Sequence, residues 1–182
     1  MRVNKCDIDG VYIIEPRIFE DARGHFFEAF SKREFAEQVC DCHFVQENEA
    51  KSLYGVVRGL HFQLPPHAQS KLVRVIKGRI LDVAVDIRKG SPTFGKHIAI
   101  ELSDENHLQI FIPHGFAHGY SVLSEEAVVE YKCDNYYAPE SEGAIAWDDE
   151  ALAIDWGIPA EQVILSEKDK HHPTLAECKN LF

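Results

Sequence analysis

The chain has few basic residues for its length. Its 182 residues include 19 Lys and Arg against 30 Asp and Glu, a formal net charge of −11. Because binding to nucleic acid requires a basic face that neutralises phosphates, this balance argues against DNA or RNA as a partner. A small anionic ligand needs only a local cluster of cations, so that class of partner stays open.

Cysteine and long apolar runs are also scarce. The five cysteines are an odd number and form no C-x-x-C pair, so reduced thiols in the cytosol are the simplest expectation. No apolar run is long enough to span a bilayer, and the first residues, MRVNKCDIDG, lack the apolar stretch of a signal peptide. We therefore expect a cytoplasmic protein with no membrane partner.

Short segments with strand character fill most of the chain, separated by Gly, Pro, Asn and Asp. The predicted strands are 11–16, 25–30, 44–52, 55–63, 71–78, 79–87, 96–103, 108–115 and 127–133. Short strands at such regular spacing are typical of a sandwich or barrel. One helix is expected after Ser31, because Glu34 follows three residues later in a capping-box pattern.

Neither a linker nor an internal repeat divides the chain. We predict one mainly β domain over residues 1–182. After Trp147 we expect loop and short helical turns packed on the barrel, and residues 175–182 are expected to form a flexible tail.

The stretch 55–78 contains an altered metal-binding motif. It resembles the G-x5-H-x-H-x3,4-E-x6-G motif of the cupin barrels, whose His and Glu side chains hold a metal. Here His61 occupies the first histidine position, Gln63 replaces the second, and Lys71 stands near the position of the acidic ligand. An ammonium group among the ligands repels a cation. The resemblance therefore implies a cupin-like barrel without a metal, with a fixed positive charge in its place.

Several sequence blocks, in order along the chain, point to one family. They are ARGHFFE (22–28), FVQEN (44–48), RGLHFQ (58–63), KLVRV (71–75), PHGFAHG (113–119), EYKCDNYYAPESEG (130–143) and LSEKD (165–169). In these blocks the chain resembles the dTDP-4-dehydrorhamnose 3,5-epimerase family. The resemblance implies a cupin-like jelly-roll barrel with short peripheral helices, a homodimer, and no cofactor. The implied reaction converts dTDP-4-dehydro-6-deoxy-D-glucose to dTDP-4-dehydro-L-rhamnose by epimerisation at C3 and C5.

The residue types suit that chemistry. Inverting a carbon beside a ketone passes through an enolate, so it needs a base, an acid on the opposite face and a positive group near the carbonyl oxygen. His61 is the candidate base, because imidazole titrates near neutral pH. Lys71 is the candidate enolate stabiliser and Tyr131 the candidate acid. The family pattern implies that Asp169 bonds to His61 and selects its tautomer.

The resemblance also implies a set of substrate-binding residues. They are Phe19, Arg23, Glu28, Gln46, Asn48, Arg58, His118, Tyr137, Glu142 and Lys168. Cationic side chains suit a diphosphate, and residues two apart on a strand, such as Gln46 and Asn48, project to the same face. In the family, the N-terminal segment that carries Arg23 and Glu28 contributes to the neighbouring subunit's site.

Other functions stay open. The chain departs from the family pattern at Glu49–Lys51, beside the expected ligand region, so an epimerase acting on one carbon only, or on a related nucleotide sugar, is an alternative. A metal-dependent cupin enzyme is another, although Gln63 and Lys71 argue against it. A noncatalytic module that binds nucleotide sugars is the third, and the presence of all four candidate catalytic residues argues against it.

Overall fold

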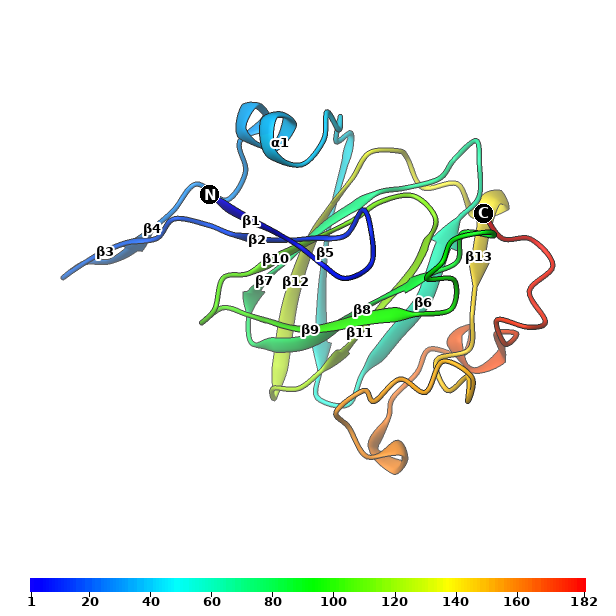
Figure 1. Cartoon of the computed structure of the whole chain (residues 1–182). Coiled ribbons are helices and arrows are strands. Elements are labelled where there is room, and N and C mark those ends of the chain that lie inside the picture. Colours follow the sequence, from blue (N-terminus) through cyan, green and yellow to red (C-terminus); the bar gives the residue numbers. More distant parts are fainter.

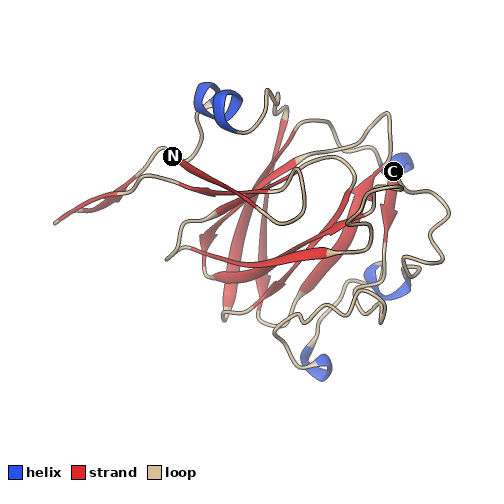
Figure 2. Ribbon diagram, in the orientation of Figure 1, coloured by secondary structure: helices blue, strands red, loops and turns tan.

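Two antiparallel β-sheets form a barrel in this computed structural model, which describes residues 1–182 (Figures 1 and 2). One sheet has six strands, in the order β1 (Arg2–Lys5), β2 (Tyr12–Glu15), β10 (Gln109–Ile112), β7 (Lys71–Lys77), β12 (Glu126–Cys133) and β5 (Gln46–Leu53). The other has five, in the order β13 (Glu142–Ala144), β6 (Val57–Gln63), β11 (Phe116–Val122), β8 (Arg79–Asp86) and β9 (His97–Ser103). The expected mainly β, cupin-like barrel with short peripheral helices is confirmed.

The main core lies between the two sheets. Val73 and Val129 enter it from the six-stranded sheet, and Ala84 and Leu102 from the five-stranded sheet, all four with no exposed surface. Inner faces of two packed sheets interdigitate in this way because each strand alternates its side chains between core and exterior. Tyr131 packs against the edge of the same core, so the candidate acid is held by the barrel interior.

The five-stranded sheet is also covered on its outer face. The C-terminal part of the chain packs there through side chains such as Ile145 and Trp156, as expected for the region after Trp147. Strand β11 is consequently buried along its whole length. The sequence does not predict this strand, because the residues FAHGYSV show no alternation between apolar and polar positions.

The last residues differ from the expected flexible tail. Leu175, Leu181 and Phe182 pack against the outer cluster, and the Phe182 carbonyl accepts a 2.7 Å hydrogen bond from the Lys89 N–H. These side chains pack against a cluster formed by residues far away in the sequence, and the local pattern of ECKNLF does not reveal that surface.

The predicted helix is confirmed as α1 (Lys32–Gln38), which covers the outer face of the six-stranded sheet (Figure 1). Ser31 is its N-cap, and its hydroxyl accepts a hydrogen bond from the Glu34 N–H. Phe35 anchors the helix by packing edge-on against Phe111, with ring centroids 5.3 Å apart. None of the helices is long and apolar enough to cross a membrane.

The predicted strand at 25–30 is confirmed only in part. Strand β4 covers Gly24–Phe26 and pairs with β3 (Phe19–Asp21) in a separate two-stranded ribbon, which Figure 1 shows projecting from the barrel. Phe19 and Phe26 are 51% and 72% exposed. An isolated ribbon is marginally stable in water, and its exposed aromatic rings are typical of a surface that contacts another molecule.

Candidate active site

A cavity of about 270 Å³ lies between the two sheets. Strands β5, β7 and β12 provide one wall, and β6 with β13 provides the other. The lining residues are Gln46, Asn48, His61, Phe62, Gln63, Gln69, Lys71, Tyr131, Tyr137 and Glu142. The barrel thus brings together three of the four candidate catalytic residues and four of the candidate substrate-binding residues.

The fourth candidate catalytic residue reaches His61 from outside the sheets. Asp169 Oδ1 lies 2.6 Å from His61 Nε2, although the two residues are 108 positions apart. Burial opposes ionisation of this carboxyl, yet hydrogen bonds from His61 and His172 lower the pKa of Asp169 to about 2. An ionised Asp169 selects the tautomer with the proton on Nε2, which leaves Nδ1 of His61 as the proton acceptor.

Lys71 and Tyr131 belong to the opposite wall. The Lys71 Nζ lies 5.9 Å from the centroid of the Tyr131 ring. Burial lowers the pKa of Lys71, and the nearby Cys133, Asp82 and Glu142 oppose that shift. Burial raises the pKa of Tyr131, so its phenol keeps the proton that an acid must donate. Base and acid therefore stand on opposite sides of one cavity.

The polar residues at the cavity are bonded to one another. Gln46 Nε2 donates to Asn48 Oδ1 at 3.1 Å, which confirms that these two side chains share a face. Tyr137 donates its hydroxyl proton to Glu142 at 3.0 Å, and Lys168 forms an ion pair with the same carboxylate. Burial opposes ionisation of Glu142, and the hydrogen bonds from Lys168 and Tyr137 lower its pKa.

Arg58 and His118 lie outside the cavity lining. Arg58 is exposed and donates to Ser52 at 3.0 Å, while its charge partly offsets the burial that raises the pKa of Tyr131. His118 is buried, pairs with His61 across strands β11 and β6, and bonds to Asp82 at 2.9 Å. Burial lowers the pKa of His118. The lowered pKa favours a neutral imidazole beside the candidate base on the neighbouring strand.

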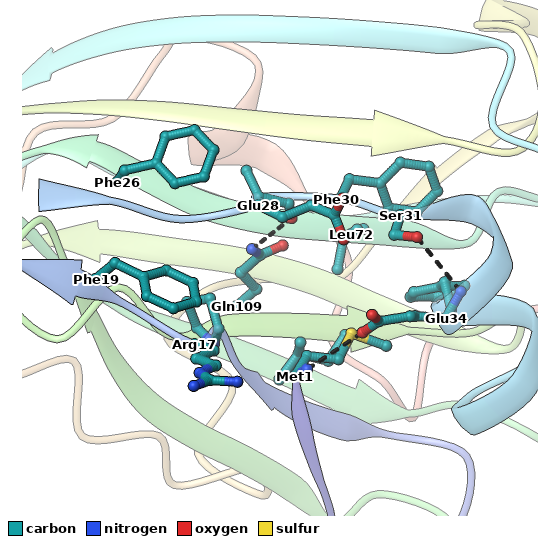
Figure 3. Close-up of a pocket in the computed structure, with 14 residues that line it drawn as sticks. Met1, Arg17, Phe19, Phe26, Glu28, Phe30, Ser31, Glu34, Leu72 and Gln109 are labelled. Carbon is teal, nitrogen blue, oxygen red and sulfur yellow. Dashed lines mark hydrogen bonds and ion pairs between the residues drawn. The ribbon is translucent and has the colours of Figure 1, made fainter.

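Three predicted substrate-binding residues lie away from this cavity in the protomer. Arg23 is on the projecting ribbon, where it is paired with Asp21. Phe19 and Glu28 line a different cavity, of about 340 Å³, at the base of the ribbon (Figure 3). Its floor is held by a 2.8 Å hydrogen bond from Gln109 to the Ala29 carbonyl.

The structure also reveals residues near the site that sequence reasoning did not select. Gln63, noted as a replaced metal ligand, donates to the carbonyls of His67 and Tyr136 and accepts from the Ala138 N–H. Its amide therefore ties together two loops at the cavity rim, a role that needs both a donor and an acceptor. The pair of His172 with Asp169, at 3.0 Å, had no recognisable signal because both residues lie in a charged, irregular segment.

The departure at Glu49–Lys51 falls largely outside the cavity. Glu49 and Lys51 are exposed on β5, and Lys51 forms a surface ion pair with Glu126. Of these three residues only Ala50 shares the inward face with Asn48, because side chains alternate along the strand. The departure therefore changes the outer surface more than the site.

One group of side chains has the composition of a metal site. The ligand atoms of His61, Asp169 and His172 lie within 4.8 Å of one another, and two histidines with a carboxylate can hold a transition metal. The Lys71 ammonium lines the same cavity as His61 and disfavours a second cation there. The arrangement is better suited to acid–base chemistry.

Comparisons with known proteins agree on one family. The family model described as dTDP-4-dehydrorhamnose 3,5-epimerase matches residues 5–177. A protein of that description from Shigella flexneri is 51% identical over 170 residues, which cover 93% of this chain and 93% of the relative. A solved structure of such an epimerase from Elizabethkingia anophelis has a TM-score of 0.94 and 51% identity, and the match covers 99% of each chain. The Legionella pneumophila dTDP-6-deoxy-D-glucose-3,5-epimerase, solved in complex with dTDP-4-keto-L-rhamnose, has a TM-score of 0.93 and 48% identity, over 97% of this chain and 93% of that chain.

Proposed function

The chain belongs to the dTDP-4-dehydrorhamnose 3,5-epimerase family. We propose that it epimerises C3 and C5 of dTDP-4-dehydro-6-deoxy-D-glucose with the residues of this cavity. The observation that carries the proposal is the placement of an Asp169-bonded His61 opposite Lys71 and Tyr131 in one cavity. These are the base, the positive charge and the acid that enolate chemistry requires.

In the proposed mechanism, His61 removes the proton from the carbon beside the C4 ketone. Asp169 stabilises the imidazolium that forms. The electrons move onto the ketone oxygen, where the Lys71 ammonium stabilises the enolate in a site of low dielectric. Tyr131 then protonates the carbon from the opposite face, which inverts its configuration. His61 then releases its proton to solvent and Tyr131 takes one up, and the same steps at the second carbon complete the reaction.

The cavity rim suits a nucleotide sugar. We assign the sugar to the space between His61 and Tyr131, with Gln46 and Asn48 as hydrogen-bonding partners beside it. The cations Arg58 and Lys168 supply charge for the diphosphate, and the ring of Tyr137, 56% exposed at the rim, offers a surface for the base. His118 lies beside His61 on the neighbouring strand in this assignment.

We further propose that the protein is a cytoplasmic homodimer. The turn of the projecting ribbon carries Arg23 away from its own barrel. Burial of the exposed rings of Phe19 and Phe26, at the base of the ribbon, against a second copy would stabilise it. The ribbon would then bring Arg23, and the segment that follows it Glu28, to the partner's cavity. The five free cysteines are compatible with a reducing compartment.

Incubation of dTDP-4-keto-6-deoxy-D-glucose with the protein in D₂O tests the function. We expect deuterium at both C3 and C5 by NMR and mass spectrometry, and no label with His61→Asn. Label at a single carbon would show a monofunctional epimerase instead. Binding of the sugar without any label would show that the protein is a binding module for it.

A further inference from the structure

A second histidine contacts the acid–base pair. His172 Nε2 lies 3.0 Å from Asp169 Oδ1, the same oxygen that bonds to His61 Nε2 at 2.6 Å. The His172 side chain is only 9% exposed and that of Asp169 only 4%. One carboxylate oxygen thus accepts from two imidazoles in a site with little access for water.

The rings of the two histidines also touch. His61 and His172 are packed edge to face, with centroids 5.6 Å apart and planes at 88°. Rotation of the Asp169 carboxylate away from His61 would break its bond to His172 as well. The geometry therefore constrains the carboxylate from two directions.

This constraint is important because Asp169 is not on a strand. His61 is held by β6, which pairs with both β11 and β13. Asp169 begins a single 3₁₀ turn, Asp169–His171, in an irregular segment. Short connecting segments are more mobile than paired strands, so the acid needs local contacts to stay within reach of the base.

The next residue connects His172 to the barrel. The Pro173 carbonyl accepts a 2.8 Å hydrogen bond from the Ala146 N–H, two residues beyond the end of β13. The backbone on the C-terminal side of His172 is therefore fixed to the sheet edge that pairs with β6. A continuous series of contacts runs from this edge through His172 to Asp169 and His61.

We propose that His172 is a positioning residue for the acid–base pair, which holds the Asp169 carboxylate in the orientation that bonds His61. The inference rests on the proposed role of His61 as the base. His172 acts through Asp169 and does not enter the cavity lining. Loss of a hydrogen bond to a charged group typically lowers activity about 10–100-fold.

The test compares three variants. His172→Ala should lower kcat about 10–100-fold while KM for the dTDP sugar stays within about twofold, because substrate contacts are unchanged. His172→Gln can place an amide N–H near the position of Nε2 and should recover most of the lost kcat. His171→Ala is the matched control, since this neighbouring histidine is exposed and should behave as wild type.

A second readout needs no turnover. In histidine-labelled protein, NMR should show a low-field imidazole N–H resonance from the short His61–Asp169 bond in wild type and in His172→Gln, and its loss in His172→Ala. Wild-type kcat in His172→Ala, or equal impairment of the Ala and Gln variants, would overturn the proposal. If the wild type itself exchanged no label into the sugar, the proposed function would fail, and the resonance would still decide the positioning role.

Discussion

At the scale of single residues, Tyr131 is the clearest test of the two-sided mechanism. Because burial raises its pKa, the phenol should be protonated at neutral pH and serve as the acid. Tyr131→Phe removes this proton but leaves the base intact. We expect solvent deuterium exchange to persist while epimerised product falls about 10²–10⁴-fold.

The measurement follows label and product in the same D₂O reaction. Tyr136→Phe is the control, since that ring is 65% exposed and outside the cavity lining. Equal loss of exchange and product in Tyr131→Phe would show that Tyr131 positions the substrate and does not donate the proton.

Ionisation of Asp169 also contributes to the free energy of unfolding of the protein. Its pKa is lowered to about 2 in the fold from about 3.9 in an unfolded chain. A lowered pKa contributes stability that is complete above the unfolded value and is lost as the pH falls through the folded value. The contribution is of the order of 2 kcal/mol, because one pKa unit corresponds to about 1.4 kcal/mol.

Asp169→Asn should therefore differ from wild type in a pH-dependent way. The difference in free energy of unfolding should be constant above about pH 5 and shrink by roughly 2 kcal/mol toward pH 2, as measured by urea unfolding with tryptophan fluorescence. The exposed Asp148, as Asp148→Asn, is the control. A difference that is the same at pH 3 and pH 7 would contradict the assigned ionisation.

At the scale of elements, the close approach of β6 and β11 determines where His61 stands. A Cβ on Gly59 would lie 2.6 Å from the Gly119 Cα and 2.8 Å from the His118 carbonyl oxygen, at a φ of +127°. Gly59→Ala must therefore separate the two strands beside the His61–His118 pair. We expect a loss of about 3 kcal/mol or more in the free energy of unfolding, with reduced activity.

Gly90→Ala distinguishes the cost of a positive φ from the cost of a steric clash. Gly90 also has a positive φ, +83°, but nothing lies within 4 Å of the added Cβ, so only the backbone penalty of roughly 1–2 kcal/mol applies. Urea unfolding of both variants makes the comparison. Similar losses at the two positions would show that the strands can separate at Gly59 at little cost.

At the scale of the whole molecule, subunit exchange tests whether the ribbon completes the partner's site. His61→Asn and Arg23→Glu variants should each be nearly inactive, one without a base and the other with a reversed charge on the ribbon. In a random mixture half of the dimers are mixed, and one of the two sites in each mixed dimer is intact. We therefore expect about a quarter of wild-type activity to return.

The mixture is made by co-expression with two affinity tags, and light scattering reports its mass. Purified mixed dimers without activity would show that Arg23 serves the site of its own subunit. A protein that is monomeric at assay concentration would remove the dimer from the proposal.

Local features of the sequence determined much of this architecture. Alternation along β5 correctly placed Gln46 and Asn48 on one face, and Ser31 with Glu34 located the start of α1. Both signals act over a few residues, through the pleat of a strand and the free N–H groups of a helix end. The family resemblance likewise depended on continuous blocks of residues.

Only the tertiary structure decided the contacts between distant segments. The bond between His61 and Asp169 joins residues 108 positions apart, and only the family resemblance indicated it. The contact of His172 with the same carboxylate had no signal in the sequence. Arg23 is close in sequence to the barrel strands, yet it lies in the turn between β3 and β4, on the ribbon that projects from the barrel (Figure 1). Such placements follow from how the two sheets and the C-terminal segment pack, and packing of remote surfaces leaves no periodic pattern in the chain.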